Sequence, residues 1–327
     1  MNVISERTLY LSSEDLSTSG DSRIININVP TQLTNYRNTN RLKMILNSFS
    51  AAKTWYTTNE YNGIFYIANT NSDDLYECRI PDGNYTDLDD IKTILETKIL
   101  DVLVANFNFA RPADRVNVTY DAISAHFTIT LSKSAPNIKF VAFSITGDFQ
   151  AVPDSPLDDA LNDIFNSPGK YNDVDQILGG QTNKSVAGLT NISQIKNLFD
   201  IETVNEVFIS KFPGNLQTND AIYLRITTLP TNNLQSTNLS NNINQNLIIS
   251  SDILGKVLLP SDISTKFISY LDFDENFGID VQASQFSQLR ISITDNKSRL
   301  IPTALSKNGT EQSINFAISL KLKEYSQ

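Results

Sequence analysis

The sequence predicts an all-β fold, an antiparallel β-sandwich in one or two modules with a few short helices. The first observation is a repeated alternation of apolar and polar residues, which is typical of strands with one face on a core and one face in solvent. The second is a charged fraction of 19%, below the roughly 25% typical of soluble domains. Asn, Ser and Thr make up the difference, and such residues favour turns between strands.

The N-terminal part, residues 1–150, is predicted to form one β module. Apolar residues alternate with asparagines over 25–29. They alternate again over 116–120 and 127–131, on either side of a short Asp-Ala-Ile-Ser connection. Two alternating runs joined by a short connection predict a β-hairpin.

The C-terminal part, residues 201–327, is predicted to form a second β module. Alternation is clearest over 222–226, 289–293 and 314–322. In the last of these, one face of the strand consists of Ile314, Phe316, Ile318, Leu320 and Leu322. Strands with one polar face are typical of antiparallel sheets, whereas parallel strands read as continuous apolar runs.

One amphipathic helix is predicted over 86–103. Thr86 can cap it, and the aspartates that follow place negative charge at the positive end of the helix dipole. Apolar residues then recur with the spacing of a single helical stripe. The residues of that stripe are Leu88, Ile91, Leu95, Ile99, Val102 and Leu103.

The stretch before this helix, residues 80–85, is predicted to be a strand that ends in a turn at Gly83. A phosphate-binding loop is excluded, because both common loop motifs need several glycines at fixed spacing and Gly83 stands alone. The aspartates at the helix start would also repel a phosphate.

A mixed connector is expected over 151–200, where several prolines and glycines interrupt the strand pattern. Short helices are predicted within it at 156–165, 174–178 and 192–199. A polar, asparagine-rich stretch at 231–246 indicates a long surface loop and a candidate contact surface.

The charge and the cysteine count restrict the setting in which the protein works. A formal net charge of -10 argues against direct contact with nucleic acid, whose phosphates attract Lys and Arg. No apolar run reaches membrane-spanning length and no secretory leader is recognisable, so we expect a soluble, unsecreted chain without a transmembrane segment. The lone Cys78 fits a reducing compartment.

Catalytic chemistry is not indicated, and we expect no enzyme activity, cofactor or metal. The single histidine, His126, falls at an outward position of a predicted strand without a nucleophile motif beside it. One Cys and one His cannot supply the usual zinc ligands. Paired carboxylates could serve a glycosidase, but nothing in the sequence distinguishes a pair.

A calcium loop at 272–278 remains an alternative to a solvated turn. Asp272, Asp274 and Asn276 occupy the first, third and fifth places of an EF-hand loop. The glycine comes one place late, at Gly278, and Ala283 stands where the loop needs a glutamate. These departures favour the turn.

Aromatic residues are concentrated over 55–67, in WYTTNEYNGIFYI. The simpler interpretation is core plus a turn at 61–63. The alternative is a subunit interface, where aromatic side chains are enriched. The candidate interface residues are Trp55, Tyr56, Tyr61, Phe65 and Tyr66.

Several segments occur in a distinctive order along the chain. They are RTLYLSSEDLSTSGDSRIININVP, RLKMILNSFSAAKTWYTTNEYNGIFYI, YECRIPDGNYTDLDDIKTIL, VNVTYDAISAHFTITL, ILGG and QLRISITDNKSRLI. In this order the chain resembles the jelly-roll minor capsid and penton proteins of eukaryotic double-stranded DNA viruses, which include virophages, Polinton-like viruses and giant viruses.

This resemblance implies a jelly-roll capsid protein of the virion, assembled inside the host cell. It would be a minor capsid or penton protein that joins major capsid protein and other capsid proteins in an icosahedral shell. It would form a homo-oligomer, a pentamer or a trimer. The rival interpretations are a receptor- or carbohydrate-binding β-sandwich module of a virus or phage, and an enzyme of the glycosidase type.

Overall fold

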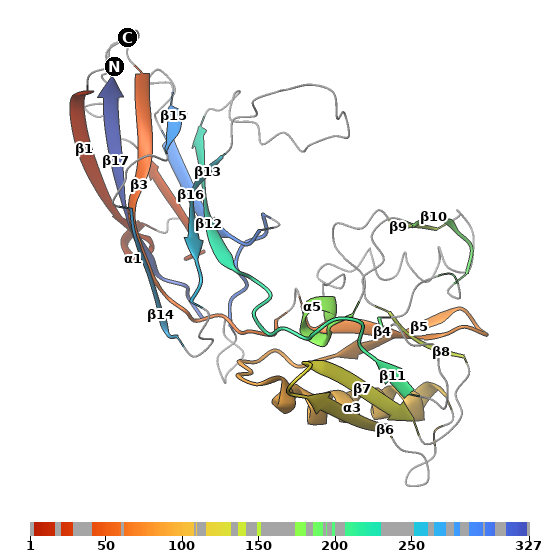
Figure 1. Cartoon of the computed structure of the whole chain (residues 1–327). Helices are drawn as coiled ribbons and strands as arrows, with labels where there is room; N and C mark the ends of the chain where they lie inside the picture. Colours follow the sequence, from red (N-terminus) through yellow and green to blue (C-terminus); the bar gives the residue numbers. More distant parts are fainter. Residues whose placement is uncertain are drawn as a thin grey trace. The chain divides into compact units, whose positions relative to one another are not determined.

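The computed structural model of the chain divides into two compact units, both drawn in Figure 1. Unit 1 comprises Met1–Trp55 and Asn219–Gln327, and unit 2 is Tyr56–Thr218. Unit 2 is therefore an insertion between two parts of unit 1. The structure describes residues 3–16, 21–28, 41–59, 62–107, 109, 116–131, 137–141, 149–151, 174–180, 186–191, 194, 198–199, 207–229, 252–260, 265–272, 278–281, 288–296, 298–304 and 312–325.

Unit 1 is a sandwich of two antiparallel sheets. The first sheet has the order β1 (Val3–Ser12), β17 (Phe316–Tyr325), β3 (Arg41–Ala52) and β14 (Phe267–Leu271), with β15 (Ile279–Val281) also paired to β3. The second sheet has the order β13 (Ile253–Leu258), β12 (Ala221–Leu229), β16 (Gln288–Thr294) and β2 (Ile24–Asn28). A short helix, α1 (Ser13–Leu16), follows β1.

The strand order of unit 1 is that of a jelly roll. When β14 and β15 are counted as one, the first, eighth, third and sixth strands of the unit form one sheet. The second, seventh, fourth and fifth form the other. Eight strands in two sheets connected as Greek keys define this fold. The predicted all-β jelly roll is confirmed, as a single sandwich that carries an insertion.

The units do not follow the boundaries expected at residues 150 and 200. Strands β1, β2 and β3 of the N-terminal part pair with strands of the C-terminal part and share one sandwich with them. An alternating pattern tells which face of a strand is buried, but it does not tell which strand lies beside it. For that reason the sequence suggested two modules in succession.

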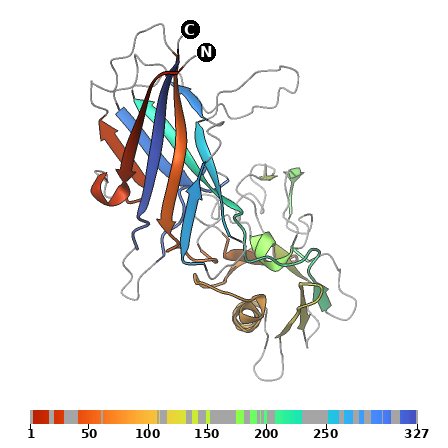
Figure 2. The same ribbon diagram turned by 60° about the vertical axis from the view of Figure 1, so that its left-hand side comes forward.

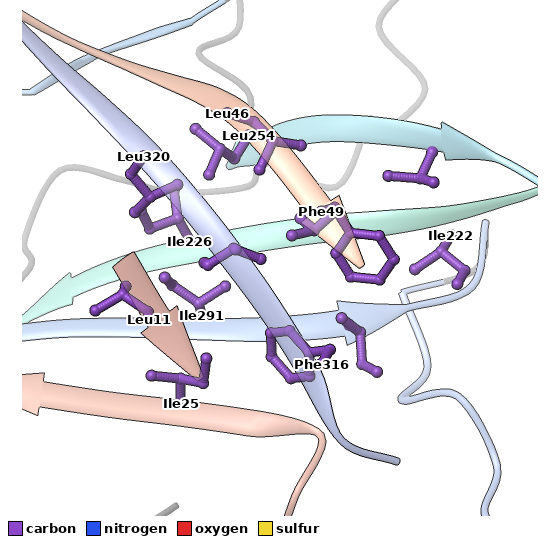
Figure 3. Packing of buried hydrophobic residues seen from close by; sticks show 14 of the residues in the cluster. Leu11, Ile25, Leu46, Phe49, Ile222, Ile226, Leu254, Ile291, Phe316 and Leu320 are labelled. Carbon is purple, nitrogen blue, oxygen red and sulfur yellow. The ribbon is translucent and has the colours of Figure 1, made fainter. Parts of the chain in front are cut away.

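Apolar side chains from both sheets fill the interior of unit 1, as Figure 3 shows. Phe49 of β3 and Phe316 of β17 stack with ring centroids 6.1 Å apart. Ile222 and Ile226 of β12 and Ile291 of β16 approach from the second sheet. All five residues of the predicted apolar face at 314–322 are buried.

The described residues of unit 2 form three small sheets and two helices. The three-stranded sheets are β5 (Asp74–Arg79), β4 (Ile64–Asn69) and β8 (Ile138–Val141), and β11 (Val207–Ile209), β7 (His126–Leu131) and β6 (Val116–Asp121). A parallel pair is formed by β9 (Phe149–Ala151) and β10 (Val186–Leu189), and the helices are α3 (Leu88–Asn106) and α5 (Val174–Leu178). The predicted hairpin, β6 with β7, and the short helix at 174–178 are confirmed.

Phe140 of β8 stands at the centre of the aromatic core of unit 2. Its ring centroid lies 4.8 Å from that of Phe208, 5.4 Å from that of Phe199 and 6.3 Å from that of Phe65. The pairs with Phe208 and Phe199 are edge-to-face, and such pairs add to the free energy of folding beyond the area they bury. Phe140 thus joins β8 to β4 and β11.

Helix α3 begins two residues later than predicted and ends three residues later. Its cap is Asp87 and not Thr86, because the Asp87 carboxylate accepts a hydrogen bond from the backbone N–H of Asp89 at 3.0 Å. Glu96, halfway along the helix, accepts a hydrogen bond from the backbone N–H of Val118 at 3.2 Å. Since β6 pairs only with β7 among the described strands, α3 covers the edge of β6 that lacks a strand.

Residues 80–85 do not form the predicted strand, because β5 ends at Arg79. Gly83 instead pairs with Thr58 in an isolated antiparallel bridge. The predicted helix at 156–165 and the polar loop at 231–246 lie outside the described residues. So do most of the predicted helix at 192–199 and residues 273–277 of the candidate calcium loop.

A pair of leucines in β13 tests the placement of the core. Leu254 is 3% exposed and Leu258 is 67% exposed. We expect Leu254→Ala to lower the free energy of unfolding by about 3 kcal/mol, through lost burial and the cavity it leaves. Leu258→Ala should change it by less than about 0.5 kcal/mol. Urea titration followed by circular dichroism measures both, and equal effects would contradict the sheet orientation.

Candidate functional site

The aromatic stretch and the glycine stretch, which the sequence presents separately, meet at one corner of unit 2. Thr58 and Gly83 exchange two backbone hydrogen bonds of 3.0 Å. Beside them, the Thr57 hydroxyl accepts a hydrogen bond from the backbone N–H of Tyr85 at 2.9 Å and lies 3.1 Å from the Gly83 carbonyl oxygen. We call residues 56–59, 62–63 and 80–85 the corner.

Asn62 holds the corner to the end of unit 2. The residue is 5% exposed, and both the oxygen and the nitrogen of its side-chain amide form hydrogen bonds. The amide oxygen accepts from the backbone N–H of Asn59 at 2.8 Å. The amide nitrogen donates to the Thr57 carbonyl at 2.8 Å and to the Thr218 hydroxyl at 2.9 Å. One side chain therefore connects Thr57, near the start of the inserted unit, to Thr218 at its end.

Three of the five candidate interface residues lie in cores. Trp55 belongs to the core cluster of unit 1, whereas Phe65 and Tyr66 are buried in β4 of unit 2. Burial raises the pKa of the Tyr66 phenol well above its ordinary value. Tyr56 is partly exposed, and Tyr61 lies outside the described residues. The stretch thus supplies two cores, and Tyr56 is the described member that retains surface.

The structure also exposes large apolar side chains that are not among the predicted interface residues. Ile123 is 98% exposed and Tyr10 is 80% exposed. The others are Val3, Ile4, Phe212, Leu258, Phe267 and Leu271. Strand parity could have indicated Tyr10, because the partly buried Leu9 and the buried Leu11 on either side of it point to the core.

Ile123 sits on a tightly bonded hairpin tip. The Asp121 carboxylate accepts hydrogen bonds from the Ile123 backbone N–H at 2.9 Å and from the Ser124 hydroxyl at 2.6 Å. The pKa of Asp121 is held below its ordinary value, mainly by the hydrogen bond from the Ser124 hydroxyl and next by that from the Ile123 backbone N–H. Ala125 completes the turn in the left-handed region, at φ 56°. The tip is therefore fixed while its isoleucine is in solvent.

The residues considered for catalysis or metal binding are dispersed. His126 is partly exposed, as expected, and its Nδ1 lies 2.7 Å from the Ser124 carbonyl oxygen. Cys78 is buried in β5, and burial raises the pKa of its thiol. Among the described residues, no three His, Cys, Asp or Glu side chains gather as metal ligands would.

No helix in the described part of the chain is both long and apolar enough to cross a membrane.

The outer face of the first sheet of unit 1 carries a row of charges. Glu6 of β1 lies opposite Lys323 of β17, which lies opposite Lys43 of β3. The carboxylate of Glu6 is 3.5 Å from the Lys323 ammonium and 3.8 Å from that of Lys321. The negative charge nearest the edge of this sheet is thus already matched to the positive charges on the adjacent strand.

Comparison with known proteins gives several similar solved structures. No family model and no curated protein matches the chain. A crystal structure of mavirus penton protein is similar with a TM-score of 0.43 and 14% identity, over 98% of this chain and 100% of that chain. A 3.5 Å cryo-EM structure of the Sputnik virophage is similar with a TM-score of 0.33 and 12% identity, over 98% of each chain.

Asn62 offers a test of the corner. Asn62→Ala removes the partners of one buried N–H, one carbonyl and one hydroxyl, and buried polar groups without partners are costly. We expect the free energy of unfolding of unit 2 to fall by about 3 kcal/mol. The exposed Asn71 in the same unit is the control, and Asn71→Ala should have little effect. Hydrogen exchange of the amides of residues 62–80 reports on unit 2 directly, and unchanged exchange in Asn62→Ala would contradict this role.

Proposed function

We propose that this chain is a structural protein of a viral shell, a minor capsid or penton protein of a eukaryotic double-stranded DNA virus. It works in the virion and is assembled inside the host cell. Its partners are major capsid protein and other capsid proteins of an icosahedral shell. It forms a homo-oligomer, a pentamer at a vertex or a trimer between capsomers, and it performs no catalysis.

The observation that supports this proposal is where the resembling segments fall on the fold. RTLYLS lies on β1, IININ on β2, RLKMILNSFSAA on β3 and QLRISIT on β16. These four strands contribute to both sheets of the jelly roll. Viral capsid domains and lectin domains share this fold, so the fold alone does not select a function. The resemblance of these segments to capsid proteins favours the shell.

Exposed apolar side chains on unit 1 also support the proposed role in a shell. Large contiguous apolar patches on a soluble chain mark contact sites, although single exposed residues are ordinary. On the first sheet of unit 1, Tyr10 at one edge and Phe267 and Leu271 at the other are exposed on the outer face. Figure 2 shows this face toward the viewer, without a described helix or strand of unit 1 in front of it.

Particle purification tests the proposal. We expect the chain to co-purify with virions, and electron microscopy of those particles to show its density in the shell. Five copies around a vertex would identify a penton, and density beneath or between capsomers would identify a cement protein. A chain that stays monomeric and never co-purifies with particles would contradict the proposal, and glycan binding without incorporation would favour a receptor-binding module.

Tyr56 tests the predicted aromatic interface. Because this ring keeps exposed surface at the corner, we expect Tyr56→Ala to reduce the oligomer fraction about tenfold near the dissociation midpoint, measured by mass photometry. Tyr120→Ala, on a partly exposed ring of β6 in the same unit, is the matched control. Equal losses in the two variants would remove Tyr56 from the interface.

A further inference from the structure

The corner contains two of the dipeptides in this chain that form cyclic imides most readily. Asn-Gly occurs at 62–63 and 308–309, and Asp-Gly occurs at 82–83. In such dipeptides the backbone nitrogen of the glycine can attack the side-chain carbonyl carbon, and the missing Cβ leaves that approach open. The pairs at 62–63 and 82–83 are held near each other, since the Gly63 carbonyl accepts a hydrogen bond from the Ile80 N–H at 2.8 Å. The corner therefore brings two reactive dipeptides together.

The chemistry available to Asn62 needs only water. The Gly63 backbone nitrogen attacks Cγ of Asn62 and gives up its proton, the bond from Cγ to the side-chain nitrogen breaks, and ammonia leaves. Water then adds to either carbonyl of the five-membered imide and opens the ring. The products are aspartate and isoaspartate, so an amide becomes a carboxylate without any oxidant or cofactor.

The closed corner blocks this reaction. The side-chain oxygen of Asn62 accepts from the Asn59 N–H at 2.8 Å. The side-chain nitrogen donates to the Thr57 carbonyl at 2.8 Å and to the Thr218 hydroxyl at 2.9 Å. Attack turns the planar amide carbon tetrahedral and moves both atoms out of these bonds. Because the residue is also only 5% exposed, we expect Asn62 to react only after the corner opens.

Asp82 is restrained by the same bridge. Its imide requires attack by the Gly83 backbone nitrogen, and that N–H donates to the Thr58 carbonyl at 3.0 Å. The Asp82 carboxylate is itself held by the Arg79 guanidinium at 2.9 Å. One opening of the corner therefore releases both dipeptides.

A converted corner cannot close again. A carboxylate accepts hydrogen bonds but donates none, so it cannot replace the bond from Asn62 to the Thr57 carbonyl. Isoaspartate also lengthens the backbone by one CH₂ before Gly63. The space there is tight, because a Cβ on Gly63 would lie 3.0 Å from the Ile80 carbonyl oxygen and 3.1 Å from that of Asn59.

We propose that Asn62 is a deamidation site controlled by opening of the corner, and that its conversion permanently prevents the corner from closing. Local opening of a folded protein is ordinarily reversible. Here the chemistry turns a transient opening of the inserted unit into an irreversible one. This inference goes beyond the proposed function and does not rest on it.

Rates of deamidation test the proposal on the full chain. Peptide mass spectrometry follows Asn62 in the folded chain at neutral pH, and acetyl-Asn-Glu-Tyr-Asn-Gly-Ile-Phe-amide, the sequence of residues 59–65, gives the unprotected rate in the same buffer. We expect Asn62 in the chain to react about a hundredfold more slowly than in the peptide. This ratio should match the opening constant obtained from hydrogen exchange of the Ile80 and Gly83 amides, which are bonded across the corner.

Two threonine variants provide a matched pair. Thr218→Val keeps the side-chain shape and removes the hydroxyl that accepts from Asn62, so we expect deamidation of Asn62 to become about fivefold faster. Thr93→Val, on the exposed face of α3 in the same unit, should leave the rate unchanged. If Thr218→Val unfolds in a urea titration, the agreement between deamidation and exchange in the unaltered chain decides the matter.

Asn62→Asp imitates one product of the reaction. The amides of residues 62–80 should lose their protection from hydrogen exchange in this variant, whereas the amides of β17 in unit 1 should keep theirs.

Four results would overturn the proposal. They are deamidation of Asn62 in the folded chain as fast as in the peptide, a rate that does not match the opening constant, equal acceleration in the two threonine variants, and full protection of residues 62–80 in Asn62→Asp. None of these results bears on incorporation into particles, which tests the proposed function separately.

Discussion

The fold depends on bringing the two ends of the inserted unit together. The chain leaves the jelly roll after β3 and returns at β12, so both crossings must occupy one connection of the sandwich. On the side of unit 1, the backbone N–H of Lys53 donates to the Lys266 carbonyl, and that of Leu259 donates to the Asp220 carbonyl. On the side of unit 2, Asn62 reaches Thr218. Because the cost of closing a loop grows slowly with its length, an insertion of this size is tolerated when its ends are fixed.

Because of this arrangement, the N-terminal and C-terminal parts of the chain form the sandwich together. Each N-terminal strand of unit 1 pairs with C-terminal strands: β1 with β17, β2 with β16, and β3 with β14, β15 and β17. No pair among these described strands is local in sequence. The hydroxyls of Ser13 and Ser22 extend the same relation, since they accept hydrogen bonds from the backbone N–H groups of Phe316 and Ile314. The inserted unit must therefore leave both parts free to meet.

The sequence predicted local structure well and long-range pairing poorly. Alternation located β12, β16 and β17, and helical spacing located α3, because these patterns follow from which face is buried. It failed for β4, where five consecutive residues from Ile64 are buried and no alternation survives. That run contains Phe65 and Tyr66, and an aromatic cluster looks the same in sequence whether it fills a core or an interface. Pairing of Thr58 with Gly83 also left no local signal.

The outer faces of the two sheets of unit 1 differ in how their side chains are engaged. Outside the second sheet, Arg225 binds Asp252 and the Thr294 hydroxyl, so the polar side chains there are engaged with one another. Outside the first sheet, small residues of β3 and β17 pair in register, as Ser48 does with Ser319, between the exposed Tyr10 and Leu271 of the edge strands. The exposure of Tyr10 and Leu271 does not stabilise the isolated chain, because leaving apolar surface in water costs free energy. The first sheet therefore keeps exposed apolar side chains on both of its edge strands, whereas the polar side chains named on the second sheet are paired with one another.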